Sequence, residues 1–184
     1  MISLDRLLRR LYYRLLRSDP LKEYIKRGLV IGTNVYIEPE ATIDYSHAWL
    51  IEIGNDVTLA PYVHIFAHDA STRRHVGYTR IGKVRIGNRV FIGTGSIVLP
   101  GVTIGDDVII GAGSVVTHDI PNGQVAAGNP ARTLCSIADY EKKTRERMSR
   151  NPCFGKEYKL NYGVTDDMKQ HMKTEMKSGI GYIV

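Results

Sequence analysis

Aliphatic residues recur every six positions along the middle of the chain. This period differs from the ~3.6 residues of an α-helix and from the alternation of a half-buried strand. It is interrupted twice, by four extra residues before Ile53 and by a longer segment before Ile86. The leading aliphatics of the twelve repeats are Ile31, Ile37, Ile43, Ile53, Leu59, Ile65, Ile86, Ile92, Val98, Ile104, Ile110 and Val116.

Each repeat is long enough for a short strand and a tight turn. Residues such as Gly87, Asn88 and Asp106 follow the leading aliphatic and supply the turn chemistry. Three repeats make one triangular coil, so the pattern predicts about four coils stacked at the ~4.8 Å spacing of β-strands. Each aliphatic side chain is buried only when a neighbouring coil stacks on it. We therefore expect a mainly β domain over 29–133, from which a loop over 66–83 leaves the regular coil.

Helical periodicity begins the chain. Leucines spaced three and four apart, from Leu4 to Leu15, follow a Ser3 cap and predict a helical N-terminal element within 1–28. The two ends of a stack of coils need covering elements, and we expect this helix to cover the first coil. Its other face is rich in arginine, so contact with a membrane surface is the weaker alternative.

The C-terminal tail over 134–184 is polar and contains two segments of helical character, near 138–149 and 166–177. Its sequence assigns it no chemical role. Cys135 and Cys153 are the only cysteines of the chain. Two cysteines cannot form a disulfide framework, and neither has the neighbours of a metal site.

The formal net charge of +6 belongs to the two ends. Residues 1–28 hold eight basic and three acidic side chains and 134–184 hold ten and seven, whereas 29–133 hold seven and nine. No nucleic-acid-binding motif accompanies this charge, so we expect no nucleic-acid partner. No segment approaches the ~18 apolar residues of a membrane span, and arginine interrupts the N-terminus too often for a secretory signal. We expect a cytoplasmic protein.

The chain resembles the hexapeptide-repeat acyltransferases in its six-residue repeat, in the loop that begins FAHDAS, and in the run RIGNRVFIGTGSIVLPGVTIGDDVIIGAGSVVTHDIPNGQVAAGNPAR. The run is most similar to sugar and xenobiotic O-acetyltransferases, such as galactoside and maltose acetyltransferases. The resemblance covers about 31–132 and implies a left-handed parallel β-helix and a homotrimer with active sites between neighbouring prisms. The implied reaction transfers an acetyl group from acetyl-CoA to a hydroxyl of a saccharide or glycan-like acceptor.

Acetyl transfer to a hydroxyl needs a base for the acceptor proton. Histidine can be both base and acid near neutral pH, a role worth roughly 10²–10⁴ in rate. His68 opens the loop over 66–83, and loops on a rigid scaffold often carry function. By resemblance it is the family's catalytic base, although the family often has Gly-His-Pro where this chain has Ala67-His68-Asp69. The weaker candidates are His47, His64, His75, His118 and His171.

Four residues are candidates for the acceptor site. Asp44 begins the first interruption, where it either stands near the acceptor or orients His68; a turn aspartate is the alternative. Trp49 and Tyr78 can stack on a sugar ring or serve only in packing. Phe91 replaces a tryptophan that related sugar enzymes have near the acceptor, which points to a different acceptor.

The donor residues are implied by the resemblance. The backbone beside Gly93-Thr94 is the family's thioester contact, and an N–H there stabilises the oxyanion by about 3 kcal/mol. Ala112 matches a position where small size lets the pantetheine arm lie against the coils. Thr117-His118 match a Thr-Lys pair that reaches the coenzyme A phosphates, and histidine is the weaker phosphate partner. Arg132 is the better phosphate ligand by residue type.

Several alternatives stay open at this level. N-acetyl transfer to an amino sugar or another amine would use the same base, and an acyl carrier protein could replace coenzyme A. A non-catalytic β-helix is a further reading, as is a zinc carbonic anhydrase with three histidine ligands. His64 and His68 lie four positions apart, but a third ligand has no clear candidate, so we expect no metal. A covalent mechanism is not expected, because neither cysteine has a histidine within a few residues.

Overall fold

Short parallel strands dominate the protein. The computed structural model describes residues 20–176 and 179–184. Sheet A contains β1 (Val30–Ile31), β4 (Ile51–Ile53), β9 (Val84–Ile86) and β12 (Thr103–Ile104). Sheet B contains β2 (Tyr36–Ile37), β5 (Thr58–Leu59), β10 (Phe91–Ile92), β13 (Ile109–Ile110), β15 (Gln124–Gly128) and β16 (Ala131–Ser136). Sheet C contains β3 (Thr42–Ile43), β6 (His64–Ile65), β11 (Ile97–Val98) and β14 (Val115–Val116).

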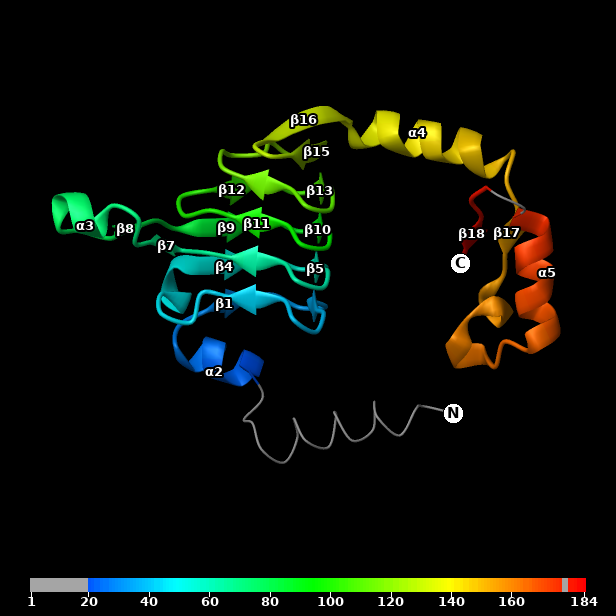
Figure 1. Cartoon of the computed structure of the whole chain (residues 1–184), viewed down its shortest axis with the longest axis horizontal. Coiled ribbons are helices and arrows are strands. Elements are labelled where there is room, and N and C mark those ends of the chain that lie inside the picture. Colours follow the sequence, from blue (N-terminus) through cyan, green and yellow to red (C-terminus); the bar gives the residue numbers. More distant parts are fainter. Residues whose placement is uncertain (1–19, 177–178) are drawn as a thin grey trace. The chain divides into compact units, whose positions relative to one another are not determined.

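From β1 to β6, and again from β9 to β14, consecutive strands belong to sheets A, B and C in turn, and the chain then returns to sheet A one level further along (Figure 1). Strands of successive levels pair in parallel, with Ile31 beside Ile53 and Ile86 beside Ile104. Each predicted repeat contributes one short strand, and its leading aliphatic is the last residue of that strand. The expected mainly β fold with parallel sheets is confirmed. We call this stack of coils the prism.

The core of the prism is a column of aliphatic side chains. Ten of the leading aliphatics are at most 3% exposed, namely Ile43, Ile53, Leu59, Ile65, Ile86, Ile92, Val98, Ile104, Ile110 and Val116. Two buried serines take the place of valine at the fifth repeat position. Ser96 and Ser114 each donate a hydrogen bond from Oγ to the carbonyl oxygen of Gly111. A buried hydroxyl is tolerated here because it is hydrogen-bonded.

The turn residues join each coil to the next. At one corner Asn55 Oδ1 accepts a hydrogen bond from the backbone N–H of Thr33 at 2.8 Å, and Asn88 Oδ1 accepts one from Asn55 at 3.0 Å. Asp106 Oδ1 accepts from the N–H of Asn88 at 2.7 Å. The amides and carboxylates expected for turn chemistry therefore form a ladder, which satisfies backbone donors that leave the sheets.

Different elements cover the two ends of the prism. α2 (Pro20–Lys26) precedes β1, and its Leu21 and Tyr24 pack against the core. The leucine pattern and the Ser3 cap of the expected N-terminal helix lie outside the described residues. At the other end β15 pairs antiparallel with β16. Because of this pairing the first compact unit extends to Ile137, slightly beyond the boundary expected at 133.

The second compact unit runs from Ala138 to Val184. Its elements are α4 (Ile137–Met148), β17 (Cys153–Phe154), η2 (Lys156–Tyr158), η3 (Leu160–Tyr162), α5 (Asp166–Met176) and β18 (Tyr182–Ile183). Phe154 is buried, and its ring lies 5.1 Å from that of Tyr158. Among the described residues of both units, no helix has the length and apolar character needed to cross a membrane.

Candidate active site

The two interruptions of the repeat meet at one edge of sheet C. The first follows β3 and includes Asp44 and η1 (Ala48–Leu50). The second follows β6 and includes β7 (His68–Asp69), α3 (Arg73–Val76) and β8 (Arg80–Ile81). Ile43 and Ile65 are paired in register, so the residues that follow them lie in adjacent coils. β7 pairs antiparallel with β8, and residues 70–79 between them form a projection that we call the finger.

Asp44 and His68 form a pair at the base of the finger. Asp44 Oδ2 lies 2.5 Å from His68 Nδ1 and accepts a second hydrogen bond, at 3.0 Å, from the backbone N–H of Ala67. Asp44 Oδ1 accepts hydrogen bonds from the N–H groups of Ser46 and His47. Asp44 is only 5% exposed, so its carboxylate is fully engaged inside the protein. Of the two roles expected for Asp44, this geometry favours orienting His68 over contacting the acceptor.

The surroundings of Asp44 keep its carboxylate ionised. Burial raises the pKa of Asp44, but the hydrogen bonds from His68 and Ala67 and the charge of His68 lower it, and the net pKa lies below the ordinary value. An ionised carboxylate at Nδ1 favours the tautomer that has its proton on that nitrogen. The Nε2 atom of His68 is then the nitrogen that can accept a proton.

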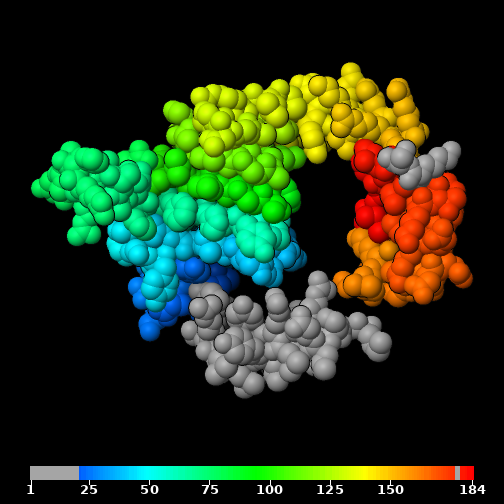
Figure 2. Space-filling model, in the orientation of Figure 1, coloured from blue at the N-terminus to red at the C-terminus, as the bar shows by residue number. Residues whose placement is uncertain are grey.

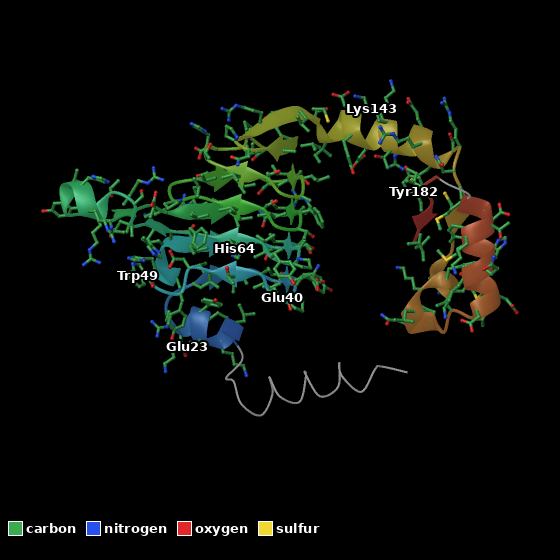
Figure 3. All side chains as sticks on the ribbon, viewed as in Figure 1. Glu23, Glu40, Trp49, His64, Lys143 and Tyr182 are labelled. Atoms are coloured by element: carbon green, nitrogen blue, oxygen red, sulfur yellow. The ribbon has the colours of Figure 1, made fainter. Side chains whose placement is uncertain are left out.

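His47 is the neighbour that sequence reasoning placed only among the weaker bases. Its ring centroid lies 4.9 Å from that of His68 and 5.2 Å from that of Trp49. The signal for it was its position three residues after Asp44 in the same interruption. Trp49 is 56% exposed and lies on η1 at the edge of the prism (Figure 3). The rings of His68, His47 and Trp49 thus form a continuous aromatic surface.

Three side chains of this corner could hold a metal ion. Ligand atoms of Asp44, His47 and His68 all lie within 4.8 Å of one another. His64 stands apart from them, because its Nδ1 lies 2.6 Å from Thr42 Oγ1 and its ring stacks on Phe66. Within the described residues, the three-histidine site of the carbonic anhydrase alternative is therefore not assembled.

The residues expected at the thioester lie at the corner between sheets B and C. A Cβ atom added to Gly93 would lie 2.6 Å from the backbone nitrogen of Ala112, so the two coils touch at this point. The carbonyl oxygen of Thr94 accepts a hydrogen bond from Gly113 at 2.8 Å. Thr94 and Ala112 are both exposed on this corner. We call Gly93, Thr94 and Ala112 the donor column.

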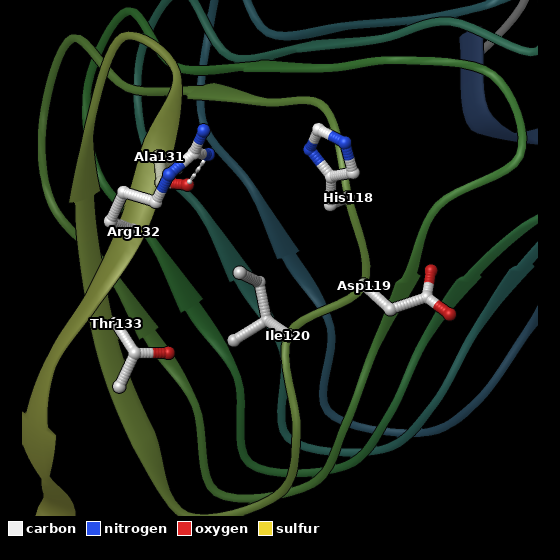
Figure 4. Close-up of a pocket in the computed structure, with 6 residues that line it drawn as sticks. All are labelled: His118, Asp119, Ile120, Ala131, Arg132 and Thr133. Carbon is white, nitrogen blue, oxygen red and sulfur yellow. Dashed lines mark hydrogen bonds between the residues drawn. The ribbon is translucent and has the colours of Figure 1, made fainter.

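The structure brings His118 and Arg132 to one pocket. The pocket has a volume of ≈ 330 Å³ and is lined by His118, Asp119, Ile120, Ala131, Arg132 and Thr133 (Figure 4). The Nδ1 atom of His118 lies 2.7 Å from Thr117 Oγ1, and Arg132 donates a hydrogen bond to the carbonyl oxygen of Ala131. The pocket therefore holds a guanidinium and an imidazole beside an open surface, a combination that suits a phosphate group.

The donor column and His68 are not brought together within one chain. His68 follows β6, whereas Thr94 precedes β11, and these two strands pair in parallel register. The two groups therefore lie at opposite ends of the strands of sheet C. Phe91 projects from sheet B at 45% exposed, and Tyr78 is 80% exposed on the finger. Among the interactions of the described residues, neither Phe91 nor Tyr78 forms a ring contact or a hydrogen bond with His68.

Comparison with known proteins places these features in context. Residues 83–118 match the family described as "Bacterial transferase hexapeptide (six repeats)". The chain is 38% identical over 161 residues to Protein CapG of Staphylococcus aureus, covering 84% of this chain and 90% of that protein.

Two solved structures share the fold. A maltose O-acetyltransferase from Clostridium difficile 630 is similar with a TM-score of 0.52 and 35% identity, covering 69% of this chain and 81% of that one. A galactoside acetyltransferase in complex with coenzyme A gives a TM-score of 0.54 and 29% identity, covering 72% and 78%. The resemblance seen in the repeat and in the C-terminal run is thus confirmed.

Proposed function

Because the chain belongs to the hexapeptide-repeat acyltransferase family, we propose that it transfers the acetyl group of acetyl-CoA to a hydroxyl group of a saccharide or glycan-like acceptor. That it is an acyl-transferring enzyme follows from its acetyltransferase relatives. The observation that carries the finer proposal is the Asp44–His68 pair at the base of the finger. An oriented imidazole on an exposed edge is the group that the proton transfer requires.

His68 is the general base of the proposed reaction. Its Nε2 takes the proton of the acceptor hydroxyl while the hydroxyl oxygen attacks the thioester carbonyl carbon. The backbone beside Gly93-Thr94 stabilises the resulting oxyanion. The tetrahedral intermediate then breaks its C–S bond, and the leaving thiolate of coenzyme A takes the proton from His68. Asp44 holds the imidazole in place and stabilises its protonated form throughout.

The separation of the base and the donor column supports a homotrimer. His68 and Thr94 lie at opposite ends of the strands of sheet C, so one chain alone does not assemble the site. In a ring of three prisms the donor column of one protomer can face His68 of the next. The left-handed winding, which the family resemblance implies, and the number of about four coils, which the repeats predict, belong to the same proposal.

The pocket that holds Arg132 and His118 supports coenzyme A as the donor. It lies at the end of the prism formed by β15 and β16, and its guanidinium suits a phosphate of the coenzyme. The galactoside acetyltransferase that shares this fold was solved with coenzyme A bound. The small residues of the donor column leave room along the coils for the pantetheine arm.

Replacing the base tests the mechanism. We expect His68→Ala to lower kcat about 10²- to 10⁴-fold without changing the oligomeric state or the binding of acetyl-CoA. His171→Ala, in the second compact unit, is the control and keeps the wild-type rate. Turnover of His68→Ala near the wild-type value would refute the proposed base. Parallel assays with glucose and glucosamine separate transfer to a hydroxyl from transfer to an amine.

A further inference from the structure

The finger and the strand that closes it hold most of the positive charge of the prism. Arg73, Arg74, Arg80 and Lys83 lie within residues 70–83, a segment without an acidic residue. They are four of the seven basic side chains of 29–133, which also hold nine acidic ones. Figures 1 and 2 show this segment, with α3 at its tip, projecting from the prism. The rest of 29–133 holds three basic and nine acidic side chains, so the excess of positive charge is local to residues 70–83.

In the described part of the chain, only one of these cations, Arg80, has an acidic partner. Among the described residues, Arg73, Arg74 and Lys83 form no ion pair, and all three are exposed. Arg80 pairs only loosely, with Nη2 lying 3.4 Å from Asp69 Oδ2. Two arginines elsewhere on the prism are paired more closely, Arg85 with Glu52 at 3.1 Å and Arg89 with Asp107 at 2.6 Å. Charge on the finger is therefore available to a ligand.

The cations are tied to the proposed active site by strand pairing. His68 lies opposite Ile81, and the neighbouring Asp69 lies opposite Arg80. An acceptor whose hydroxyl meets His68 thus lies at the base of a basic projection. Val76 and Tyr78 are exposed on the same finger and offer apolar surface to a sugar ring. The finger combines the two kinds of contact that an anionic sugar uses.

We propose that the acceptor is an acidic saccharide, whose carboxylate or phosphate group binds the cations of the finger while its hydroxyl meets His68. Guanidinium groups bind both anions through paired hydrogen bonds. Clustered positive charges repel one another in the free protein, and an anionic ligand relieves that repulsion. The inference rests on the proposed function, because it names the acceptor class of the same site.

The experiment compares matched acceptors. Glucuronate, glucose 6-phosphate and glucose are assayed with acetyl-CoA as acceptors for wild type, for Arg73→Ala/Arg74→Ala, and for the control Lys142→Ala/Lys143→Ala. The control removes two exposed charges from α4 in the second compact unit. The same three proteins are tested for binding of polygalacturonate and of the neutral polymer dextran, which gives a readout that does not depend on turnover.

We expect wild type to have a higher kcat/KM for an anionic acceptor than for glucose. Comparing kcat/KM for glucuronate with that for glucose 6-phosphate shows whether the finger prefers a carboxylate or a phosphate. The double arginine variant should lose about fivefold to tenfold of that preference, with its rate on glucose unchanged. Added NaCl should weaken the preference in wild type, because exposed charges are screened. The control should behave as wild type in turnover and in polymer binding.

Equal kcat/KM for charged and neutral acceptors in wild type would overturn the inference, as would a preference that survives in the arginine variant. If none of the sugars is acetylated, polygalacturonate binding that is lost in the arginine variant alone supports it, and binding that is absent or retained overturns it. Failure of the proposed function looks different: acetyl-CoA then neither raises the thermal midpoint nor is consumed with any acceptor.

Discussion

Asp44 Oδ2 lies 2.5 Å from His68 Nδ1, although the two residues are 24 positions apart in the sequence. The contact depends on the register of sheet C, in which Ile43 is paired with Ile65. Both residues therefore leave the regular coil at the same corner, one coil apart. The aspartate is buried and the histidine is partly exposed, as the proposed roles of orienting group and general base require.

Removing the charge of Asp44 should impair the reaction. We expect Asp44→Asn to lower kcat about 10²-fold or more, because an amide no longer holds the Nδ1 proton or stabilises the protonated imidazole. The KM for acetyl-CoA should stay within about twofold of wild type, since the Asp44 carboxylate is buried and is hydrogen-bonded to His68 and to backbone N–H groups of its own corner. Asp107→Asn, at an exposed corner, is the matched control. A kcat of Asp44→Asn near wild type would contradict the orienting role.

The same substitution should change how stability depends on pH. The pKa of Asp44 lies below its ordinary value in the folded protein, so its ionised form stabilises the fold above about pH 4, the ordinary range of an aspartate. That contribution is lost as the pH falls through the folded-state pKa. At pH 7 Asp44→Asn should be less stable by about 1–3 kcal/mol, and the difference should shrink below about pH 4. Urea unfolding of both proteins across this pH range measures it.

Arg132 should recognise a phosphate of coenzyme A. Arg132→Ala should raise the Kd for coenzyme A about 10- to 100-fold, the loss expected for a charge-assisted hydrogen bond. His118→Lys adds a fixed charge to the same pocket and should strengthen binding. Titration with coenzyme A and with dephospho-coenzyme A shows whether the 3′-phosphate is the group involved. Equal effects on both ligands would argue against 3′-phosphate recognition.

The close contact between coils should make one class of glycine irreplaceable. A Cβ atom on Gly54 would lie 2.6 Å from the carbonyl oxygen of Gly87 in the next coil, whereas one on Gly101 meets no atom within 4 Å. Gly101 has a φ of +89°, so Gly101→Ala should cost only the ~1–2 kcal/mol of a left-handed backbone. Gly54→Ala must move backbone and should lose more in chemical denaturation. A smaller loss for Gly54→Ala than for Gly101→Ala would be inconsistent with this packing.

The sequence by itself determined the strands and named the candidate residues of the site. A prism buries one aliphatic side chain per repeat, so burial is written into the chain with a fixed period, as at Ile92 and Ile110. The two interruptions of that period marked Asp44 and His68 as candidates, with Asp44 expected either to orient His68 or to stand near the acceptor. The run that ends at Arg132 indicated the family and the donor.

Only the tertiary structure decided which groups of the interruptions meet. It set His47 against His68, directed the Asp44 carboxylate toward His68, and left Arg73 and Arg74 without an ion pair to any other described residue. It also placed Thr94 and His68 at opposite ends of the strands of sheet C. The physical reason is that a repeat is fixed by local burial, whereas an insertion takes its shape from contacts between segments far apart in the chain, and those depend on the assembled coils.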